Sequence, residues 1–171
     1  MTAGHLVRRF VGSLAPGTVA GDDLAWVDGQ LTEREGELWR SMPRADRRHS
    51  LAVARRVQAA LGAEATRPVL AAALLHDVGK VASGLGTYGR VMATLSGAVA
   101  GRDMAEAWSQ TRGVTRRIGL YLRHEELGAD MLELDGSEPL TVALVREHSW
   151  PDDERSVPGH LADALRAADD A

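Results

Sequence analysis

Hydrophobic residues recur along the chain at intervals of three and four positions, which is the spacing of one face of an α-helix. No stretch alternates hydrophobic and polar residues as a half-buried strand does. The pattern indicates an all-α fold. It predicts helices over about 5–14, 22–30, 32–42, 43–61, 66–80, 91–99, 101–113, 114–124, 127–132, 137–148 and 157–169.

Residues that favour helix ends stand at several of these boundaries. Thr32 and Glu35 form a capping box, Gly62 is a C-terminal stop, and Pro158 favours a helix start. The glycine-rich segment 83–89 predicts a loop. No linker or repeat divides the chain, so we expect a single domain over residues 31–171, with residues 1–30 as an N-terminal helical extension.

Composition narrows the classes of function. The net charge of −4 argues against a nucleic-acid polymer as partner. The longest apolar runs are about seven residues, against the roughly 20 that a membrane span needs, and no signal peptide is visible. We therefore expect a cytoplasmic protein without a membrane partner. The chain has no cysteine, so any metal must be held by His, Asp or Glu.

One stretch, residues 71–80, stands out because an apolar helix pattern ends on charged residues. His76 and Asp77 follow the run Ala71–Leu75, and Gly79 and Lys80 come next. Buried charge is costly unless it is paired or bound to a metal. The stretch therefore predicts a polar site at the edge of the core.

Other polar residues have a similar placement near the inner face or end of a predicted helix: His49, His124, His148 and Asp169, with Asp170 as a competitor for Asp169. Mixed imidazole and carboxylate ligands suit Zn, Fe, Mn, Ni or Co. Taken singly, each histidine fits a core or capping role better than the role of a ligand. Lys80 is a candidate phosphate contact, but a helix C-terminus also favours a cation there. Several arginines lie on the predicted helix of His49. They form either a solvated helix face or a positive surface that attracts an anionic substrate.

The order of these segments resembles that of the HD-domain superfamily of metal-dependent phosphohydrolases. Leu74–Lys80 resembles the family's "LLHDIGK" signature, and His124–Ala129 resembles the "H-x-x-x-G" segment of its binuclear members. Three further segments match in order: Arg47–Ala54 with the first histidine helix, Val145–His148 with the later histidine, and Leu165–Asp169 with the closing "AD". The resemblance implies an all-α HD-domain helical bundle.

By this resemblance, His49, His76, Asp77 and Asp169 hold one divalent transition metal. His124 and His148 bind a second, with Asp77 bridging. Two ions are expected, and Asp77 and Lys80 are the expected catalytic residues. The HD-GYP branch, which cleaves cyclic di-GMP, has paired histidines where this chain has His148 and Ser149, and its Gly-Tyr-Pro motif is absent here. Cyclic di-GMP is therefore not the expected substrate.

The resemblance implies a phosphohydrolase that cleaves a phosphate ester of a nucleotide or small phosphorylated metabolite with a metal-activated water. The expected partner is this small anionic substrate, and a homodimer stays open. Two alternatives also stay open. One is a diiron oxygenase of the HD type, and the other is a non-catalytic regulatory module that binds metal or nucleotide.

Overall fold

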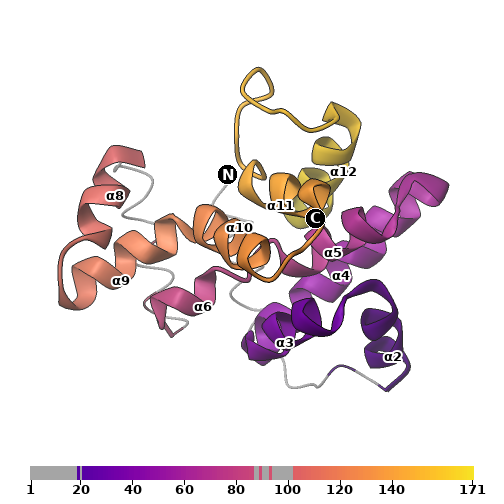
Figure 1. Ribbon diagram of the computed structural model, residues 1–171, viewed down its shortest axis with the longest axis horizontal. Helices are drawn as coiled ribbons and strands as arrows, with labels where there is room; N and C mark the ends of the chain where they lie inside the picture. Colours follow the sequence, from indigo (N-terminus) through magenta and orange to yellow (C-terminus); the bar gives the residue numbers. More distant parts are fainter. Residues whose placement is uncertain (1–18, 20, 87–88, 90–92, 94–101) are drawn as a thin grey trace.

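The computed structural model describes residue 19, residues 21–86, residues 89 and 93, and residues 102–171. All regular structure in these residues is helical, as the sequence predicts (Figure 1). The predicted helices at 5–14 and, except for Ala93, at 91–99 lie outside the described residues. The described elements are α2 (Gly21–Gln30), α3 (Glu33–Ser41), α4 (Arg44–Leu61), η1 (Gly62–Glu64), α5 (Arg67–Leu75), α6 (Lys80–Ser83), α8 (Arg102–Ser109), α9 (Gly113–Leu122), α10 (His124–Leu134), α11 (Pro139–Arg146) and α12 (Gly159–Asp170).

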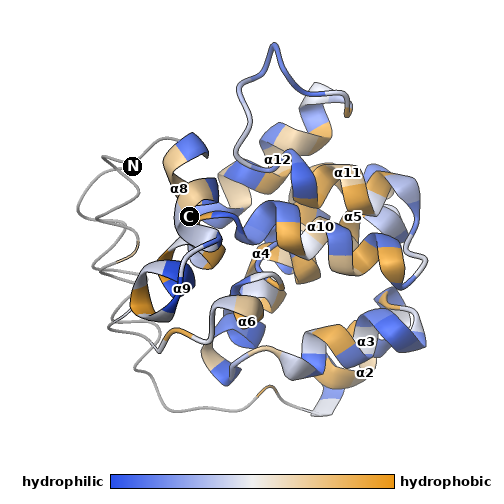
Figure 2. Cartoon of the chain, turned by 60° about the vertical axis from the view of Figure 1, so that its left-hand side comes forward, coloured by the Kyte–Doolittle hydropathy of each residue, from blue (hydrophilic) through white to orange (hydrophobic). Residues whose placement is uncertain are grey.

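Helix α5 is the centre of the core. Every residue from Val69 to Leu75 is buried, so this helix has no solvent face, which is typical of a helix surrounded by others. It packs against α4 and α11, and also against α2 and α3. In Figure 1 the helices α4, α5, α10, α11 and α12 lie together, with α2 and α3 on one side and α6, α8 and α9 on the other. Figure 2 shows the hydrophobic residues of these helices in alternation with polar ones.

The predicted caps are present. The amide of Glu35 donates to Thr32 Oγ1 at 3.3 Å, and the amide of Thr32 donates to Glu35 Oε2 at 2.8 Å, which completes the capping box. Gly62 ends α4 with a φ of 55°, a left-handed value that favours glycine. Pro158 is the N-cap of α12. Local sequence therefore determines these boundaries.

Three predicted helix boundaries near the charged residues are wrong. Helix α5 ends at Leu75 instead of near Lys80, and residues 76–79 form turns with hydrogen bonds to the third preceding residue, such as Val78 N to Leu75 O at 2.9 Å. Such turns are tighter than an α-helix and change the direction of successive side chains. His124 begins α10 instead of ending the helix before it. Helix α11 ends at Arg146, so His148 lies in the following turn.

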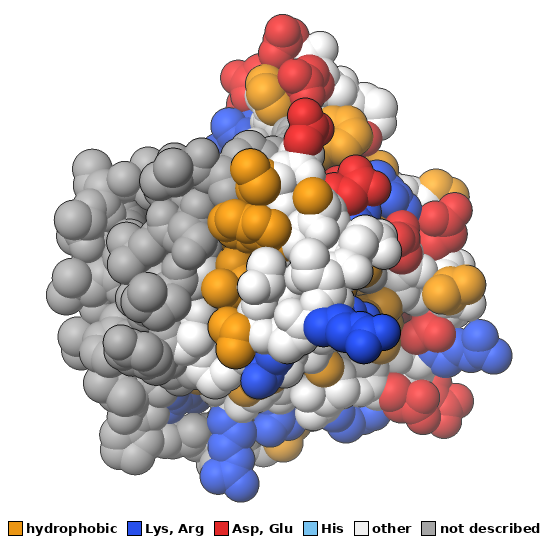
Figure 3. Space-filling model, turned by 90° about the vertical axis from the view of Figure 1, so that its left-hand side faces the viewer, with side chains coloured by type: hydrophobic (Ala, Val, Ile, Leu, Met, Phe, Trp, Pro, Cys, Tyr) orange, Lys and Arg blue, Asp and Glu red, His pale blue; other side chains and the backbone are white. Residues whose placement is uncertain are grey.

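No helix in the described part of the chain is long and apolar enough to cross a membrane. Helices α8 and α9 each expose a large hydrophobic side chain, Met104 at 49% and Val114 at 66%. Figure 3 shows hydrophobic side chains gathered in a band on this face.

Truncation of the α5 core should be costly. Leu74 is fully buried, and we expect Leu74→Ala to lower the free energy of unfolding by about 3 kcal/mol, because it removes apolar contacts and leaves a cavity. The matched control is Leu134→Ala, at a side chain that is 84% exposed, which should change it by less than about 0.5 kcal/mol. Urea denaturation measures both, and equal losses would contradict a core centred on α5.

Candidate metal centre

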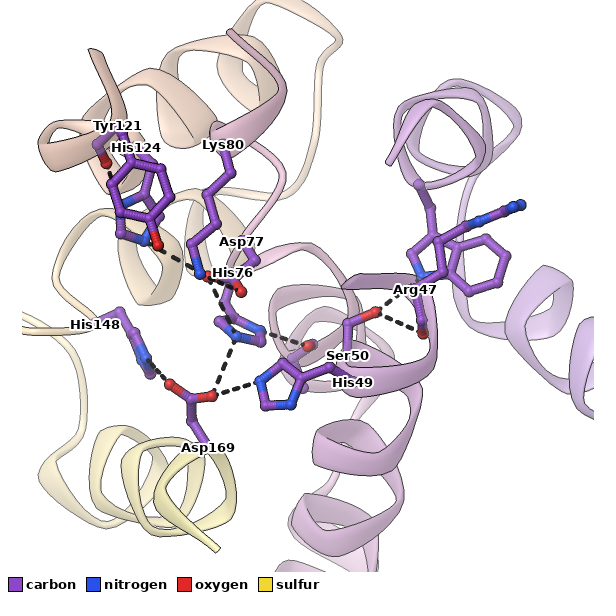
Figure 4. Close-up of polar contacts among 12 residues, drawn as sticks. Arg47, His49, Ser50, His76, Asp77, Lys80, Tyr121, His124, His148 and Asp169 are labelled. Carbon is purple, nitrogen blue, oxygen red and sulfur yellow. Dashed lines mark hydrogen bonds and ion pairs between the residues drawn. The ribbon is translucent and has the colours of Figure 1, made fainter. Parts of the chain in front are cut away.

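The residues predicted as metal ligands come together at one end of α5. They arrive from five separate segments of the chain (Figure 4). The turn after α5 holds two of them, and α4, the start of α10, the turn after α11 and the end of α12 each hold one. In that order these residues are His76 and Asp77, His49, His124, His148 and Asp169.

The carboxylate of Asp169 lies among three imidazoles. His49 Nε2 is 2.6 Å from Asp169 Oδ1, and His76 Nε2 is 3.5 Å from the same oxygen. His148 Nε2 is 3.3 Å from Oδ2. The neighbouring Asp170 is exposed and belongs to no such cluster in the described structure. The geometry therefore favours Asp169 over Asp170 as the candidate ligand.

Asp77 holds the other carboxylate of the cluster, which is buried, and its two oxygens face different groups. Oδ1 lies 3.6 Å from His76 Nε2 and 3.5 Å from His124 Nε2. Oδ2 accepts a hydrogen bond from Lys80 Nζ at 2.5 Å. Lys80 is the only lysine of the chain, and it is only 7% exposed. An ammonium ion is thus part of the site.

Two of the imidazoles are held by the same kind of hydrogen bond. His76 Nδ1 donates to the carbonyl of Ala73 at 2.9 Å, and His124 Nδ1 donates to the carbonyl of Tyr121 at 2.8 Å. Each ring is thereby fixed by the residue three positions before it, and Nε2 faces the carboxylates. Metal-binding histidines are commonly oriented by such a hydrogen bond from the other ring nitrogen.

A backbone contact between two glycines sets the distance from α10 to the turn after α5. A Cβ atom on Gly79 would lie 1.9 Å from the carbonyl oxygen of His124 and 2.6 Å from the amide nitrogen of Gly128. A Cβ on Gly128 would lie 3.1 Å from Gly79 N. Because His124 and Gly128 are four residues apart on α10, they share one helix face. The close approach brings His124 to Asp77.

Two other polar contacts support the site, and sequence reasoning missed both. Arg56, two turns after His49 on α4, donates to the carbonyl of Ala168 at 3.1 Å and thereby joins α4 to the end of α12. Buried Glu147, directly before His148, accepts from the amides of Ser156 and Val157 at 2.6 and 3.2 Å. No local pattern in the sequence indicates these contacts, since each depends on helix packing.

Several arginines near His49 have structural partners. Arg55 forms an ion pair with Asp23 of α2 at 3.0 Å and lies over the ring of Trp26, and Arg47 lies over the ring of Trp39. These contacts join α4 to α2 and α3. They support the interpretation of these two arginines as packing residues more than the interpretation that they attract a substrate.

The electrostatics of the cluster follow from burial and close opposite charge. Burial disfavours the charged form of His76, but the carboxylates of Asp77 and Asp169 outweigh it and raise the pKa of His76 to about 8. Burial likewise acts to raise the pKa of Asp77, yet Lys80 and His76 hold it well below its usual range. Hydrogen bonds from the surrounding histidines lower the pKa of Asp169 in the same way. Both carboxylates are therefore ionised near neutral pH.

The cluster fits a divalent transition metal. The candidate ligand atoms of His49, His76 and Asp77 lie within 4.8 Å of one another, and so do those of His76, His148 and Asp169. His76 Nε2 is completely buried and has no hydrogen-bond partner, although it points at two carboxylates. Buried polar atoms normally have a partner. A cation beside Nε2 would supply one, with the mixed nitrogen and oxygen ligands that such metals prefer.

Comparison with known proteins adds no family. No family model matches the chain, and no curated protein or solved structure matches it significantly. The geometry of the site and the sequence motifs are therefore the grounds for a function.

The glycine contact gives a test of the site's framework. Gly79→Ala should lower the free energy of unfolding by about 3 kcal/mol, because its Cβ would overlap backbone atoms that cannot move as a side chain can. The control is Gly29→Ala in exposed α2, where a Cβ meets nothing within 4 Å and alanine should add up to about 1 kcal/mol of helix stability. A Gly79→Ala variant as stable as wild type in urea would disprove the close approach.

Proposed function

We propose that the protein is a metal-dependent phosphohydrolase of the HD type, acting on a phosphate ester of a nucleotide or a small phosphorylated metabolite. The observation that supports this most is the meeting of four imidazoles, the buried carboxylate of Asp77 and the partly buried carboxylate of Asp169 from five segments at the end of α5. The order of the ligands along the chain resembles that of the HD superfamily, and the all-α fold agrees with it.

Each residue has a chemical role in this proposal. His49, His76, Asp77 and Asp169 hold a divalent ion. When bound, such an ion supplies Lewis acidity, which makes water a nucleophile near neutral pH and offsets charge on a phosphate. Lys80 adds a fixed positive charge beside Asp77, which favours a phosphate at this edge of the site.

His124 and His148 complete the polar wall of the site. The side chain of His124 is 18% exposed, more than that of His148 at 9%, so a substrate reaches His124 more readily. Because its Nδ1–H donates to the carbonyl oxygen of Tyr121, His124 presents Nε2 for a hydrogen bond or proton exchange with a substrate oxygen.

A purely structural role accounts for the cluster less well. A set of ion pairs that only stabilised the fold would be expected to close into hydrogen bonds, whereas His76 Nε2 stays 3.6 and 3.5 Å from the carboxylate oxygens of Asp77 and Asp169 that it faces. A regulatory module that had lost catalysis would be expected to lack one or more ligands, whereas all six predicted positions meet here. Both points favour a working metal site.

Metal content and phosphate release test the proposal together. Wild-type protein, purified without added metal under anaerobic conditions, should contain a divalent transition metal by mass spectrometry and release phosphate from a member of a panel of nucleotides and phosphate esters. His49→Gln and Asp77→Ala should lower metal affinity and turnover at least about 100-fold, because each removes a ligand. Far-UV circular dichroism should show unchanged helix content.

His160→Gln is the matched control. His160 is exposed and pairs with Glu64 at 2.9 Å, away from the cluster, so its loss should alter neither metal content nor turnover. Wild-type protein that binds no metal after reloading would contradict the proposal, as would full turnover in Asp77→Ala. Iron together with substrate-dependent O₂ consumption and no phosphate release would indicate the oxygenase alternative.

A further inference from the structure

We propose that Lys80 takes the place of a second metal ion, so that the centre holds one divalent cation per chain. This inference rests on the proposed metal centre and concerns how many ions it binds. It differs from the expectation of two ions with Asp77 as a bridge between them. There are two reasons. The candidate ligand atoms gather around His76, and one oxygen of Asp77 already binds the positive charge of Lys80.

The donor atoms gather on one side of the site. Both groups of candidate ligands among the described residues include His76, and together they comprise His49, His76, Asp77, His148 and Asp169. His124 belongs to neither group. His148, which the sequence assigns to a second ion, lies instead against Asp169, 3.3 Å from Oδ2, with its ring centroid 5.2 Å from that of His76. A second ion beside His124 would therefore lack the other imidazole expected for it.

The contacts of the Asp77 carboxylate also do not suit a bridge between two metal ions. Its Oδ1 faces His76 and His124, while its Oδ2 binds the ammonium of Lys80. A carboxylate that bridges two cations with its two oxygens needs both of them for metal. Here one oxygen is directed to the ligand side, and the other already has a positive partner.

The position of Lys80 in the fold keeps its ammonium group beside Asp77. Lys80 begins α6 three residues after Asp77, and the hydrogen bond from Lys80 N to the carbonyl of Asp77 at 3.0 Å holds the two residues together. The lysine side chain is 9% exposed and lies near the ring of Tyr121, with Nζ 5.8 Å from the ring centroid. A buried ammonium has little water to return to, so it is held by the carboxylate.

An ammonium ion in this place has two effects on metal binding. It neutralises one of the two carboxylates of the cluster, which leaves less negative charge to stabilise additional cations. It also repels a second divalent ion beside Asp77, in surroundings where solvent screens charge poorly. His49, His76 and Asp169 would still hold the first ion, together with Oδ1 of Asp77. His124 then faces the substrate instead of a metal.

The experiment is a titration of chelator-treated protein with Mn²⁺, in which electron paramagnetic resonance measures free Mn²⁺. Wild type should bind one equivalent tightly. Lys80→Met, which keeps the length of the side chain and removes its charge, should bind a second equivalent with at least about tenfold higher affinity than wild type. The signal of this variant should show spin coupling, because the two ions of a binuclear centre lie about 4 Å apart.

Two other variants are matched to this test. Lys80→Arg keeps the positive charge and should bind one equivalent. His124→Gln removes an imidazole that, in this proposal, is not a ligand, and should also bind one equivalent with affinity within about twofold of wild type, whereas His49→Gln should lose binding. Circular dichroism checks the folding of each variant. If Lys80→Met does not fold, the wild-type stoichiometry and His124→Gln decide the question.

Two equivalents of Mn²⁺ bound with similar affinity by wild type would overturn the inference, and so would a folded Lys80→Met that binds only one. A loss of tight binding in His124→Gln would also overturn it. These outcomes are distinct from failure of the proposed function. Protein that binds no Mn²⁺ at all contradicts the metal centre itself, whereas two bound ions with phosphate release contradict only the role of Lys80.

Discussion

The burial of α5 is the constraint on which the rest of the structure depends. This helix has no exposed face, so the polar residues that follow it begin at the centre of the fold and not at its surface. His76 and Asp77 are completely or almost completely buried. Charge in such a place must be matched by other charge or by a metal. The neighbouring helices α4, α10 and α12, and the turn after α11, each supply a polar residue at this point.

Close packing and electrostatics act together here. The absence of side chains at Gly79 and Gly128 allows α10 to approach the turn closely enough for His124 to reach Asp77. Arg56 and Glu147 hold the ends of the segments that present Asp169 and His148. The two carboxylates remain ionised because imidazoles and an ammonium surround them.

Sequence reasoning could predict the all-α fold, most helices and the members of the site, for different reasons. Helical spacing and caps such as Thr32 with Glu35 are local properties, and they predicted α3 and the end of α4 correctly. The six clustered residues were singled out by their placement near the inner faces or ends of predicted helices, and the resemblance of their order to that of the HD superfamily then implied a shared metal site. The exact ends of α5 and α11 were missed. Tight turns follow both helices and position site residues, and helix propensity does not predict such turns. The roles of Glu147 and Arg56 depend on contacts between distant segments, which a single sequence does not display.

The ion pair of Lys80 with Asp77 was predictable from the sequence only in part. The spacing of three residues made a contact between Asp77 and Lys80 foreseeable, and the sequence shows that Lys80 is the only lysine of the chain. The burial of that lysine was not foreseeable, since it depends on how α6, α9 and α10 pack around the turn. A motif can therefore identify which residues meet, while their charges and depths decide what the site binds.

The most direct test of the metal centre is a crystal structure of the protein grown with Mn²⁺, with diffraction data collected to record the anomalous signal of manganese. The account predicts an anomalous peak at bonding distance from His76 Nε2 and Asp169 Oδ1, with His49 in the same coordination sphere. An anomalous map without a peak at this end of α5, or with its only peaks on surface carboxylates, would contradict it.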